Sequence, residues 1–246
     1  MSVAYVSEIF SSFQGEGLFA GRRHVFLRMA GCNLRCVYCD TPESLDRTSH
    51  CTVYSQEGGE ERKRNPLSVT EVAGLLRPFL VPRRGVHALA ITGGEPLLQA
   101  FFLAELLEAV PPPVPVLLET NGTHPDRLKS LLPFVHIVSM DVKLPSSSGE
   151  PAHWAEHREF LILSREKTVY VKVPVDEATR DDELCEAAAL VAETIPAAVF
   201  FLQPILSPGA KLQISPAKLE RFYDIAVEHM SDVRVMPQTH KFLGVR

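Results

Sequence analysis

Short apolar runs alternate along the chain with longer amphipathic segments. Eight of the short runs are rich in Val, Ile and Phe and are bounded by Pro or Gly, which is typical of strands. We expect these strands at residues 4–10, 24–30, 86–92, 114–120, 135–141, 168–174, 198–204 and 233–237. Apolar residues at helical spacing predict helices between them, at residues 68–80, 96–110, 125–132, 182–195 and 215–229.

The alternation of strands and helices indicates parallel β-α-β units. Several strands are apolar on both faces, as in a sheet that helices cover. The predicted fold class is therefore α/β, a partial (β/α) barrel with a mainly parallel sheet, and an open doubly wound sheet is the alternative. Ser68 and Ser215 suit helix N-caps, and Pro96 suits a first helical turn. A chain of 246 residues can form such a fold as one domain over residues 1–246.

One segment interrupts this pattern. Residues 42–67 are polar and charged and show no sustained periodicity. A long insertion of this kind in a compact domain is usually a functional lid or a disordered span. The sequence assigns it no further role.

Composition narrows the classes of protein. A hydrophobic content of 46% is ordinary for a globular chain, and a net charge of −5 argues against a nucleic-acid partner. No apolar run approaches the ~18 residues of a membrane span. The N-terminus lacks the basic start and apolar centre of a signal peptide, so we expect a cytoplasmic protein that binds no membrane. Thiols stay reduced in that compartment, where clustered cysteines more often bind metal than form disulfides.

Polar residues follow most of the predicted strands. Ligands of β/α folds bind at the carboxyl ends of the strands, so these residues are expected to meet at one rim. The set is Glu95, Glu119, Asp141, Lys143 and His240. Each of them alone also suits a helix cap or a salt bridge.

The stretch "TGGEP" at residues 92–96 has a specific mechanical meaning. Gly93 and Gly94 lack side chains that would hold a ligand away from the main chain, so backbone N–H and C=O groups are accessible. Glu95 adds a carboxylate suited to an ammonium group. The alternative is a tight turn from strand to helix.

Arg28 lies within a predicted strand that is apolar on both faces. A buried guanidinium requires an anion, either a protein carboxylate or the carboxylate of a substrate. Lys172 poses the same problem less sharply. Near the N-terminus, Gln14 and Glu16 lie between glycines and suit the edge of a nitrogen heterocycle, although a plain turn is the alternative.

Three cysteines, Cys32, Cys36 and Cys39, lie within eight residues. No paired Cys or His at metal spacing follows them, so neither a disulfide framework nor a complete zinc tetrahedron fits. A four-iron cluster normally takes four thiolates, and three would leave one iron open for a chelating small molecule. Cys51 and Cys185 are isolated and are expected to be ordinary thiols.

This spacing together with "TGGEP" in a β/α chain resembles the radical S-adenosylmethionine enzymes. Within that superfamily the chain resembles the 7-carboxy-7-deazaguanine synthases. The resemblance spans nearly the whole chain. It is carried by the stretches "FQGEG", "FLRMAGCNLRCVYCDT", "ITGGEPLLQ", "LETNGT", "VSMDVKLP", "LQP" and "QTHKFLGVR".

The resemblance implies a 4Fe–4S cluster, S-adenosylmethionine and Mg²⁺ as cofactors. It implies a lyase that contracts the ring of 6-carboxy-5,6,7,8-tetrahydropterin to 7-carboxy-7-deazaguanine, with loss of ammonia, in queuosine and deazapurine biosynthesis. A 5′-deoxyadenosyl radical takes a hydrogen from C6 of the pterin, and the S-adenosylmethionine is regenerated. A flavodoxin- or ferredoxin-type electron donor and a homodimer are further implications.

The same resemblance implies roles for individual residues. Cys32, Cys36 and Cys39 would hold the cluster, and Thr41 would bind Mg²⁺. The residues expected at S-adenosylmethionine are Gly93, Gly94, Glu95, Asn121, Ser139, Met140, Asp141, Lys143, Gln203, Pro204 and Ile205. The residues expected at the pterin are Phe13, Gln14, Gly15, Glu16, Arg28, Thr92, His240 and the C-terminal Arg246. Arg28 would then bind the substrate carboxylate.

Two alternatives remain at this point. One is a radical activase that abstracts hydrogen from a glycine of a partner protein, which would share the cluster and "TGGEP". The other is a non-catalytic zinc-binding module that combines the three thiols with His50 or Cys51. The pterin pocket distinguishes the first alternative, and the metal content distinguishes the second.

Overall fold

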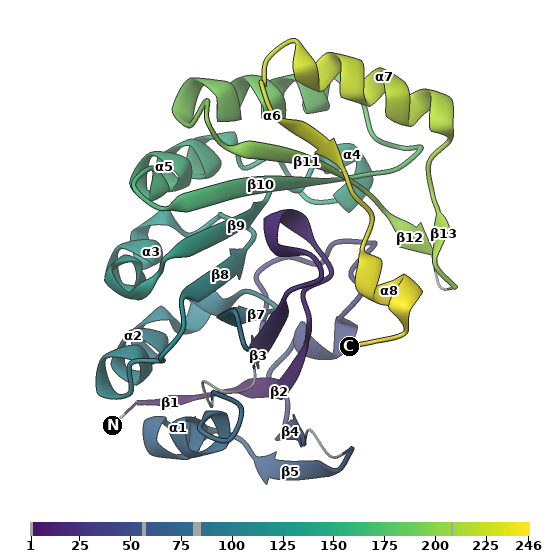
Figure 1. Cartoon of the computed structure of the whole chain (residues 1–246). Helices are drawn as coiled ribbons and strands as arrows, with labels where there is room; N and C mark the ends of the chain where they lie inside the picture. Colours follow the sequence, from purple (N-terminus) through teal and green to yellow (C-terminus); the bar gives the residue numbers. More distant parts are fainter. Residues whose placement is uncertain (1, 56–57, 81–84, 208) are drawn as a thin grey trace.

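The computed structural model describes residues 2–55, 58–80, 85–207 and 209–246. Ten strands of this part of the chain form one open sheet, whose first and last strands do not pair (Figure 1). In spatial order they are β14 (Val233–Val235), β11 (Val199–Pro204), β10 (Thr168–Val175), β9 (Ile137–Asp141), β8 (Val116–Thr120), β7 (Ala88–Gly93), β3 (Arg23–Met29), β2 (Val6–Phe13), β4 (His50–Tyr54) and β5 (Glu60–Arg64).

The sheet is mainly parallel. Every pair from β14 to β3 is parallel, whereas β2 runs antiparallel to β3, and β5 runs antiparallel to β4. Short strand pairs flank the sheet: β1 (Val3–Ala4) with β6 (Leu67–Ser68), and β12 (Leu206–Ser207) with β13 (Lys211–Leu212). Because the parallel strands share one direction, their carboxyl ends meet at one edge of the sheet.

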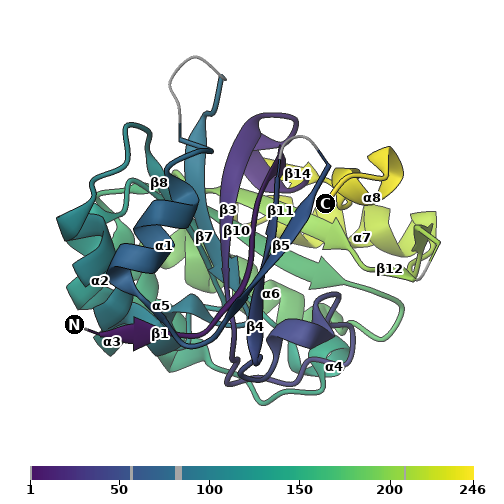
Figure 2. The same ribbon diagram turned by 90° about the horizontal axis from the view of Figure 1, so that it is seen from below.

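Helices cover the outer face of the curved sheet (Figures 1 and 2). They are α1 (Val69–Leu76), α2 (Ala100–Ala109), α3 (Pro125–Leu131), α5 (Trp154–Ser164), α6 (Asp181–Thr194) and α7 (Pro216–Val227). Ser68 caps α1 in a reciprocal capping box with Glu71. Shorter helical elements are η1 (Gly17–Phe19), η2 (Pro42–Ser44), η4 (Pro96–Gln99), η5 (Leu132–Phe134), α4 (Pro145–Ser148) and α8 (Thr239–Leu243).

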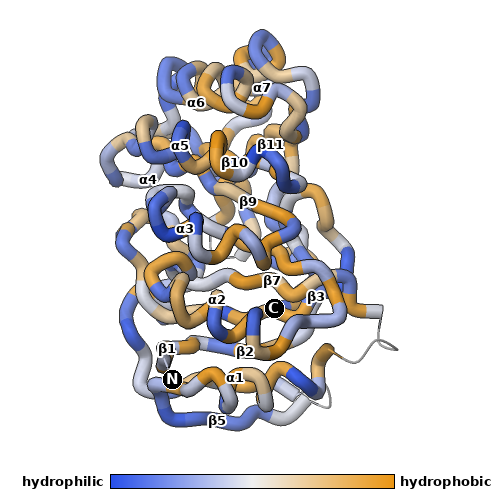
Figure 3. Tube along the Cα trace, turned by 90° about the vertical axis from the view of Figure 1, so that its left-hand side faces the viewer, coloured by the Kyte–Doolittle hydropathy of each residue, from blue (hydrophilic) through white to orange (hydrophobic). Residues whose placement is uncertain are grey.

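The two faces of the sheet differ in what they bury. On β7, Leu89 and Ile91 join the large core against the helices, whereas Ala88 and Ala90 join a smaller cluster on the inner face. Strand residues alternate between the faces, so small inner residues leave space there. Figure 3 shows hydrophobic colouring concentrated along β2, β3 and β7, while β5 at the edge is hydrophilic.

The eight predicted strands and the five predicted helices are confirmed within a few residues. α5 was missed. The interpretation of residues 42–67 as a loop without structure is wrong for most of its described part, because η2, β4 and β5 lie there; residues 56–57 lie outside the described residues. Residues 60–64 are all charged and show no alternation of apolar and polar positions, so they do not reveal a strand. β5 is an exposed edge strand that buries few side chains. In the described part of the chain, no helix is long and apolar enough to cross a membrane.

Candidate active site

One cavity of about 410 Å³ opens at the carboxyl ends of the parallel strands. Its walls come from segments distant in sequence: the loop after β3, the turn after β7, the ends of β8 to β11, the N-terminal β2 and the C-terminal α8. All three cysteines of the motif line it, together with Arg28, Glu119 and the rim residues Asp141, Lys143 and His240. The convergence predicted for the strand ends is therefore found, with Glu95 as the exception.

The three cysteines lie on the loop between β3 and η2. This loop is held from within, because the Arg35 guanidinium donates hydrogen bonds to the carbonyls of Cys32 (2.8 Å) and Leu34 (2.9 Å). Burial raises the pKa of the Cys32 thiol to about 11 and also raises that of Cys36. Since metal binding requires thiolates, loading of iron must release protons from these groups.

Gly93 and Gly94 pack directly against the loop that carries the cysteines. A Cβ atom at Gly93 would lie 2.2 Å from the Met29 carbonyl oxygen, and one at Gly94 would lie 2.3 Å from the Gly31 carbonyl oxygen. Gly93 has φ +144°, a conformation that side-chain-bearing residues rarely adopt. Only glycines allow this turn to approach the main chain of Met29 and Gly31 so closely. Three thiols beside this bare main chain fit a cluster and a chelating cofactor.

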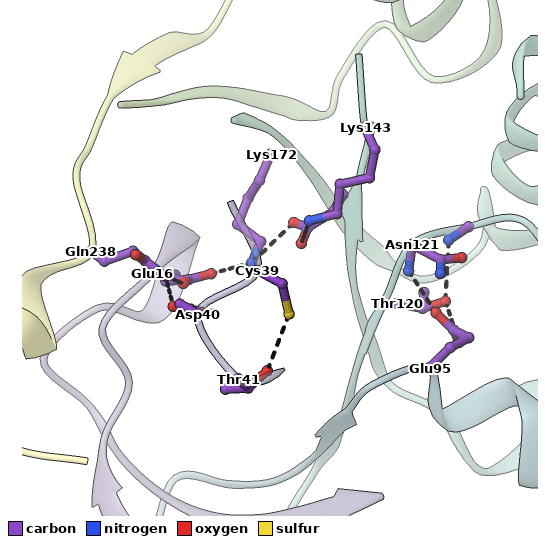
Figure 4. Close-up of polar contacts among 12 residues, drawn as sticks. Glu16, Cys39, Asp40, Thr41, Glu95, Thr120, Asn121, Lys143, Lys172 and Gln238 are labelled. Carbon is purple, nitrogen blue, oxygen red and sulfur yellow. Dashed lines mark hydrogen bonds and ion pairs between the residues drawn. The ribbon is translucent and has the colours of Figure 1, made fainter. Parts of the chain in front are cut away.

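Glu95 does not line the cavity, in contrast to the prediction. Its fully buried carboxylate accepts hydrogen bonds from the Leu97 backbone N–H (2.9 Å), the Thr120 hydroxyl (2.8 Å) and the Asn121 backbone N–H (2.8 Å). Burial raises the pKa of Glu95 to about 7, although the three donors favour the carboxylate. Glu95 therefore caps η4 and ties β7 to β8 (Figure 4), which is the turn alternative considered above.

Buried charges of both signs alternate across the middle of the cavity. The Lys172 ammonium pairs with Glu16 and lies 3.0 Å from Asp141 Oδ1, while Lys143 lies 2.8 Å from Asp141 Oδ2 (Figure 4). Burial opposes ionisation of Asp141, but Lys143 and Lys172 outweigh it and lower its pKa. The charge on Lys172 is thus compensated by protein carboxylates, and this network fixes the end of β10 against β9 and the N-terminal loop.

The C-terminal helix α8 closes one side of the cavity. Gln238 donates hydrogen bonds to Glu16 (2.6 Å) and to Asp40 (2.8 Å), the residue after the last cysteine of the motif. Burial opposes ionisation of Asp40, but Lys241 at 3.0 Å and the hydrogen bonds from Gln238 and Lys241 lower its pKa to about 2. His240 packs so closely on Gly15 that a Cβ there would lie 2.0 Å from its Nδ1.

Arg28 has a protein carboxylate as partner. Its Nε lies 3.3 Å from Glu8 Oε2, and Nη1 of Arg246 lies 3.5 Å from Glu8 Oε1. The Arg28 guanidinium also stacks over Phe10, 5.7 Å from the ring centroid. One carboxylate is therefore shared by two guanidinium groups at this end of the cavity.

The comparisons with known proteins agree with this architecture. The model of the radical SAM superfamily matches residues 26–171. A 7-carboxy-7-deazaguanine synthase of Geobacter sulfurreducens is 38% identical, over 98% of this chain and 97% of the relative. The chain belongs to the 7-carboxy-7-deazaguanine synthase family. A further synthase, from Methanothermobacter thermautotrophicus, is 35% identical over 99% of this chain and 98% of the relative.

Solved structures show the same fold. QueE from Escherichia coli superposes with a TM-score of 0.62 at 21% identity, covering 97% of this chain and 95% of that one. A radical SAM methyltransferase from Sphaerobacter thermophilus superposes with a TM-score of 0.59 at 15% identity, covering 94% of this chain and 77% of that one. The partial barrel of the radical SAM type is thus confirmed. Membership in the superfamily implies a 4Fe–4S cluster and S-adenosylmethionine, and the three thiols and the glycine edge of this synthase family member fit both groups.

Most residues predicted at the site line the cavity. They are Phe13, Gln14, Gly15, Glu16, Arg28, Cys32, Cys36, Cys39, Thr41, Thr92, Gly93, Gly94, Asn121, Asp141, Lys143, Gln203, Pro204, Ile205, His240 and Arg246. Ser139 and Met140, like Glu95, lie outside the lining. The side chain of Met140 belongs to the core under the helices, because successive residues of β9 face opposite sides of the sheet. Its side chain therefore points away from the cavity, and its place at S-adenosylmethionine stays a prediction.

Several lining residues of this family member were not predicted at the site. Glu8, Asp40, Gln238 and Lys241 contribute charge or hydrogen bonds to the cavity wall. Asp40 lies within the quoted cysteine stretch, and Gln238 and Lys241 lie within "QTHKFLGVR", which is the signal that could have found them. Glu8 is two residues from a buried aromatic in an amphipathic strand, and nothing in the sequence pairs it with Arg28.

The structure does not bring His50 or Cys51 to the three thiols, as the zinc alternative requires. Cys51 is fully buried in the core, where burial raises its thiol pKa to about 12, and His50 hydrogen-bonds Ser49 on the exposed side of β4. Neither residue lines the cavity. Within the described residues, no group of three or more His, Cys, Asp or Glu side chains is placed so that it could hold a single metal ion.

Proposed function

We propose that this chain contracts 6-carboxy-5,6,7,8-tetrahydropterin to 7-carboxy-7-deazaguanine inside the cavity, with loss of ammonia. The observation that carries the proposal is the composition of the cavity lining. It combines three thiols near Gly93 and Gly94 with two guanidinium groups that share a single carboxylate. Synthase relatives at up to 38% identity over the whole chain support it and favour it over a glycine activase.

The cofactors are assigned to the part of the cavity that the three thiols line. Cys32, Cys36 and Cys39 hold the cluster, and the backbone at Gly93 and Gly94 receives the amino group of the methionyl part. Asp141 and Lys143 and the edge Gln203–Ile205 bind the nucleoside part, with Asn121 next to the loop. When bound, the cluster and S-adenosylmethionine supply hydrogen-atom abstraction that one electron initiates.

The substrate is assigned to the part of the cavity that Arg28 and Arg246 line. Gln14 has its amide fixed, because Nε2 donates to Glu119 at 2.8 Å and Oε1 accepts from the Glu16 backbone at 3.1 Å. A fixed amide and carboxylate present donors and acceptors at set positions, as recognition of a heterocycle requires. Phe13, Gly15, Thr92 and His240 complete the walls, and Arg28 binds the substrate carboxylate.

These residues also keep the ring contraction away from water. Lys172, Glu16 and Asp141 compensate one another's charge, so the site carries fixed dipoles without requiring bulk solvent. Gln238 and Lys241 hold α8 against Asp40 and so close the side next to the last cysteine. The protein binds, orients and shields the reacting carbon, while the cofactors supply the radical chemistry.

The assignment of Mg²⁺ to Thr41 is a finer part of the proposal. The Thr41 hydroxyl lines the cavity 4.0 Å from the Cys39 sulfur. Hydroxyl oxygen suits a cation that prefers oxygen ligands. Asp40 next to it is already paired with Lys241 and Gln238, so the remaining ligands come from substrate and water.

Two assignments of partners belong to the same proposal. A flavodoxin- or ferredoxin-type protein supplies the electron, and the chain acts as a homodimer. Reduction of the cluster by each purified donor protein tests the electron donor. Sedimentation velocity of the anaerobic protein tests the homodimer, and a monomer throughout the micromolar range would contradict it.

The test of the function is anaerobic turnover. The reconstituted protein is mixed with S-adenosylmethionine, a reductant and the carboxylated tetrahydropterin, and the product is identified by mass. Formation of 7-carboxy-7-deazaguanine by the wild type, absent with Cys36→Ala, supports the proposal. Cleavage of S-adenosylmethionine without any deazapurine, in protein with a full cluster, would refute it.

A further inference from the structure

Arg246, the last residue of the chain, is held between the β4–β5 hairpin and the cavity. Its guanidinium carbon lies 3.4 Å from the centroid of the Tyr54 ring, and its Nη1 lies 3.5 Å from Glu8 Oε1. Tyr54 is the last residue of β4, in the segment whose role the sequence left open. The guanidinium is thus stacked on one side and ion-paired on the other, an arrangement that Arg adopts where it binds carboxylates.

The chain turns back to reach this position. Gly244 ends α8 with φ +65°, and the Val245 backbone N–H donates to the His240 carbonyl at 3.2 Å. This turn directs the C-terminus from α8 toward β2 and the hairpin, and the two ribbon views agree on that placement (Figures 1 and 2). Val245 and Arg246 both line the cavity, whereas Tyr54 stands behind Arg246.

Arg28 keeps unused hydrogen-bond donors in this part of the cavity. Glu8 is a single carboxylate, and it faces both Arg28 and Arg246. Arg28 uses only Nε for this pair, and within the described residues no partner is found for its two terminal nitrogens. The terminal guanidinium nitrogens of Arg28 are therefore available to an anion that enters the cavity, and the Arg246 guanidinium pairs with the same Glu8 carboxylate.

We propose that Arg28 and Arg246 form a two-guanidinium clamp for the carboxylate of the substrate, and that Tyr54 is the residue that positions Arg246. The inference rests on the proposed function, because it takes the carboxylated pterin as the substrate. It gives the β4–β5 hairpin a role: the hairpin carries the ring on which the clamp is built. Recognition of the carboxylate then depends on a segment outside the motifs of the cluster.

The experiment compares two ligands that differ only at the carboxylate. The reconstituted holoenzyme with S-adenosylmethionine is titrated anaerobically with 6-carboxy-5,6,7,8-tetrahydropterin and with its 6-methyl counterpart. Replacement of Tyr54 by Leu, or of Arg246 by Gln, is expected to raise the Kd of the carboxylated pterin on the order of tenfold, since a hydrogen bond to a charged group is lost. The Kd of the methyl compound stays unchanged and reports that the variants are folded.

Three further variants separate positioning from general stability. Tyr54→Phe keeps the ring and is expected to retain the affinity of the wild type. Tyr54→Leu combined with Arg246→Gln is expected to cost no more than Arg246→Gln alone, because Tyr54 acts through Arg246. Arg62→Gln removes an exposed charge from the same hairpin, and its Kd values should match those of the wild type.

The clamp would be overturned if Tyr54→Leu lost affinity equally for both pterins, or if the losses of affinity were additive in the double variant. If the wild type binds both pterins equally, the clamp falls while the proposed function stands. If the wild type binds neither, both fall.

Discussion

The side-chain amide of Asn121 donates a hydrogen bond to the side-chain carbonyl of Asn33 at 3.0 Å. Asn33 lies directly after the first cysteine of the motif, and Asn121 follows β8. Asn33 in turn donates to the Thr123 hydroxyl at 2.9 Å, and Glu95 accepts from the Asn121 backbone. The cysteine loop is therefore anchored to the sheet through a strand that carries no cluster ligand.

Replacement of Asn121 by Ala should loosen this anchor. The change removes one of the two partners of Asn33 and leaves the buried Thr123 N–H without its acceptor, at a cost of about 1–3 kcal/mol. We expect iron to be released to a chelator several-fold faster than from the wild type. An unchanged rate of release, together with unchanged stability, would show that the loop needs no anchor.

Replacement of Arg28 by Ala should separate substrate binding from the cluster. The side chain of Arg28 pairs with Glu8 and stacks over Phe10, so the iron content and the uncoupled formation of 5′-deoxyadenosine should stay close to the wild type, while the KM of the pterin rises on the order of tenfold or more. Iron analysis and steady-state kinetics measure both. Loss of iron in Arg28→Ala would make Arg28 a structural residue, and Arg62→Ala serves as the control.

Replacement of Lys172 by Met should strongly destabilise the protein. Lys172 is 2% exposed and pairs with Glu16 and Asp141, so its loss leaves buried carboxylates uncompensated, at about 3–5 kcal/mol. Denaturant unfolding of the apoprotein measures this. The matched control is Lys129→Met, which breaks the exposed pair with Glu159 and should cost less than about 1 kcal/mol. Similar costs for both variants would contradict the buried network.

Acid should weaken the fold through His24. Burial, followed by the neighbouring His87, lowers the pKa of His24 to about 4 from 6.5. The neutral ring is favoured in the folded state, so its contribution is complete above pH 6.5 and is lost as the pH falls toward 4. At pH 5 the loss is about 2 kcal/mol, since one pKa unit corresponds to about 1.4 kcal/mol. His24→Phe should flatten the dependence of the unfolding free energy on pH by that amount. A profile as steep as that of the wild type would show that other groups cause it.

Replacement of Thr41 by Val should reduce the response of turnover to Mg²⁺. The variant keeps the shape of the side chain and removes its oxygen ligand, so the stimulation by added Mg²⁺ seen in the wild type should shrink while the iron content stays the same. Activity as a function of Mg²⁺ concentration measures this. Equal responses of both proteins would refute the assignment of the cation to Thr41.

The sequence predicted the sheet because its inner strands are apolar on both faces and therefore form short continuous apolar runs bounded by Pro or Gly. It failed where an element buries little. β5 is exposed along most of its length, and α5 carries a weakly segregated apolar face, so neither shows a clear period. The antiparallel direction of β2 was not predicted, because strand direction is not encoded in the composition of a strand.

The site was predicted best where its chemistry follows strand ends. Asp141 and Lys143 were placed correctly for that reason. Glu95 was misplaced, because the motif shows that a carboxylate is present but not that three donors bury it. Pairs such as Glu8 with Arg28 depend on the register of β2 and β3, which only the folded chain reveals.

The central claim is that Cys32, Cys36 and Cys39 hold a four-iron cluster that lacks a fourth protein thiolate. The most direct measurement is the iron, acid-labile sulfide and zinc content of the protein purified without oxygen, with a Cys36→Ala variant beside it. The account predicts about four irons and as many sulfides per chain in the wild type, and loss of both in the variant. One zinc and no iron in the wild type would contradict it.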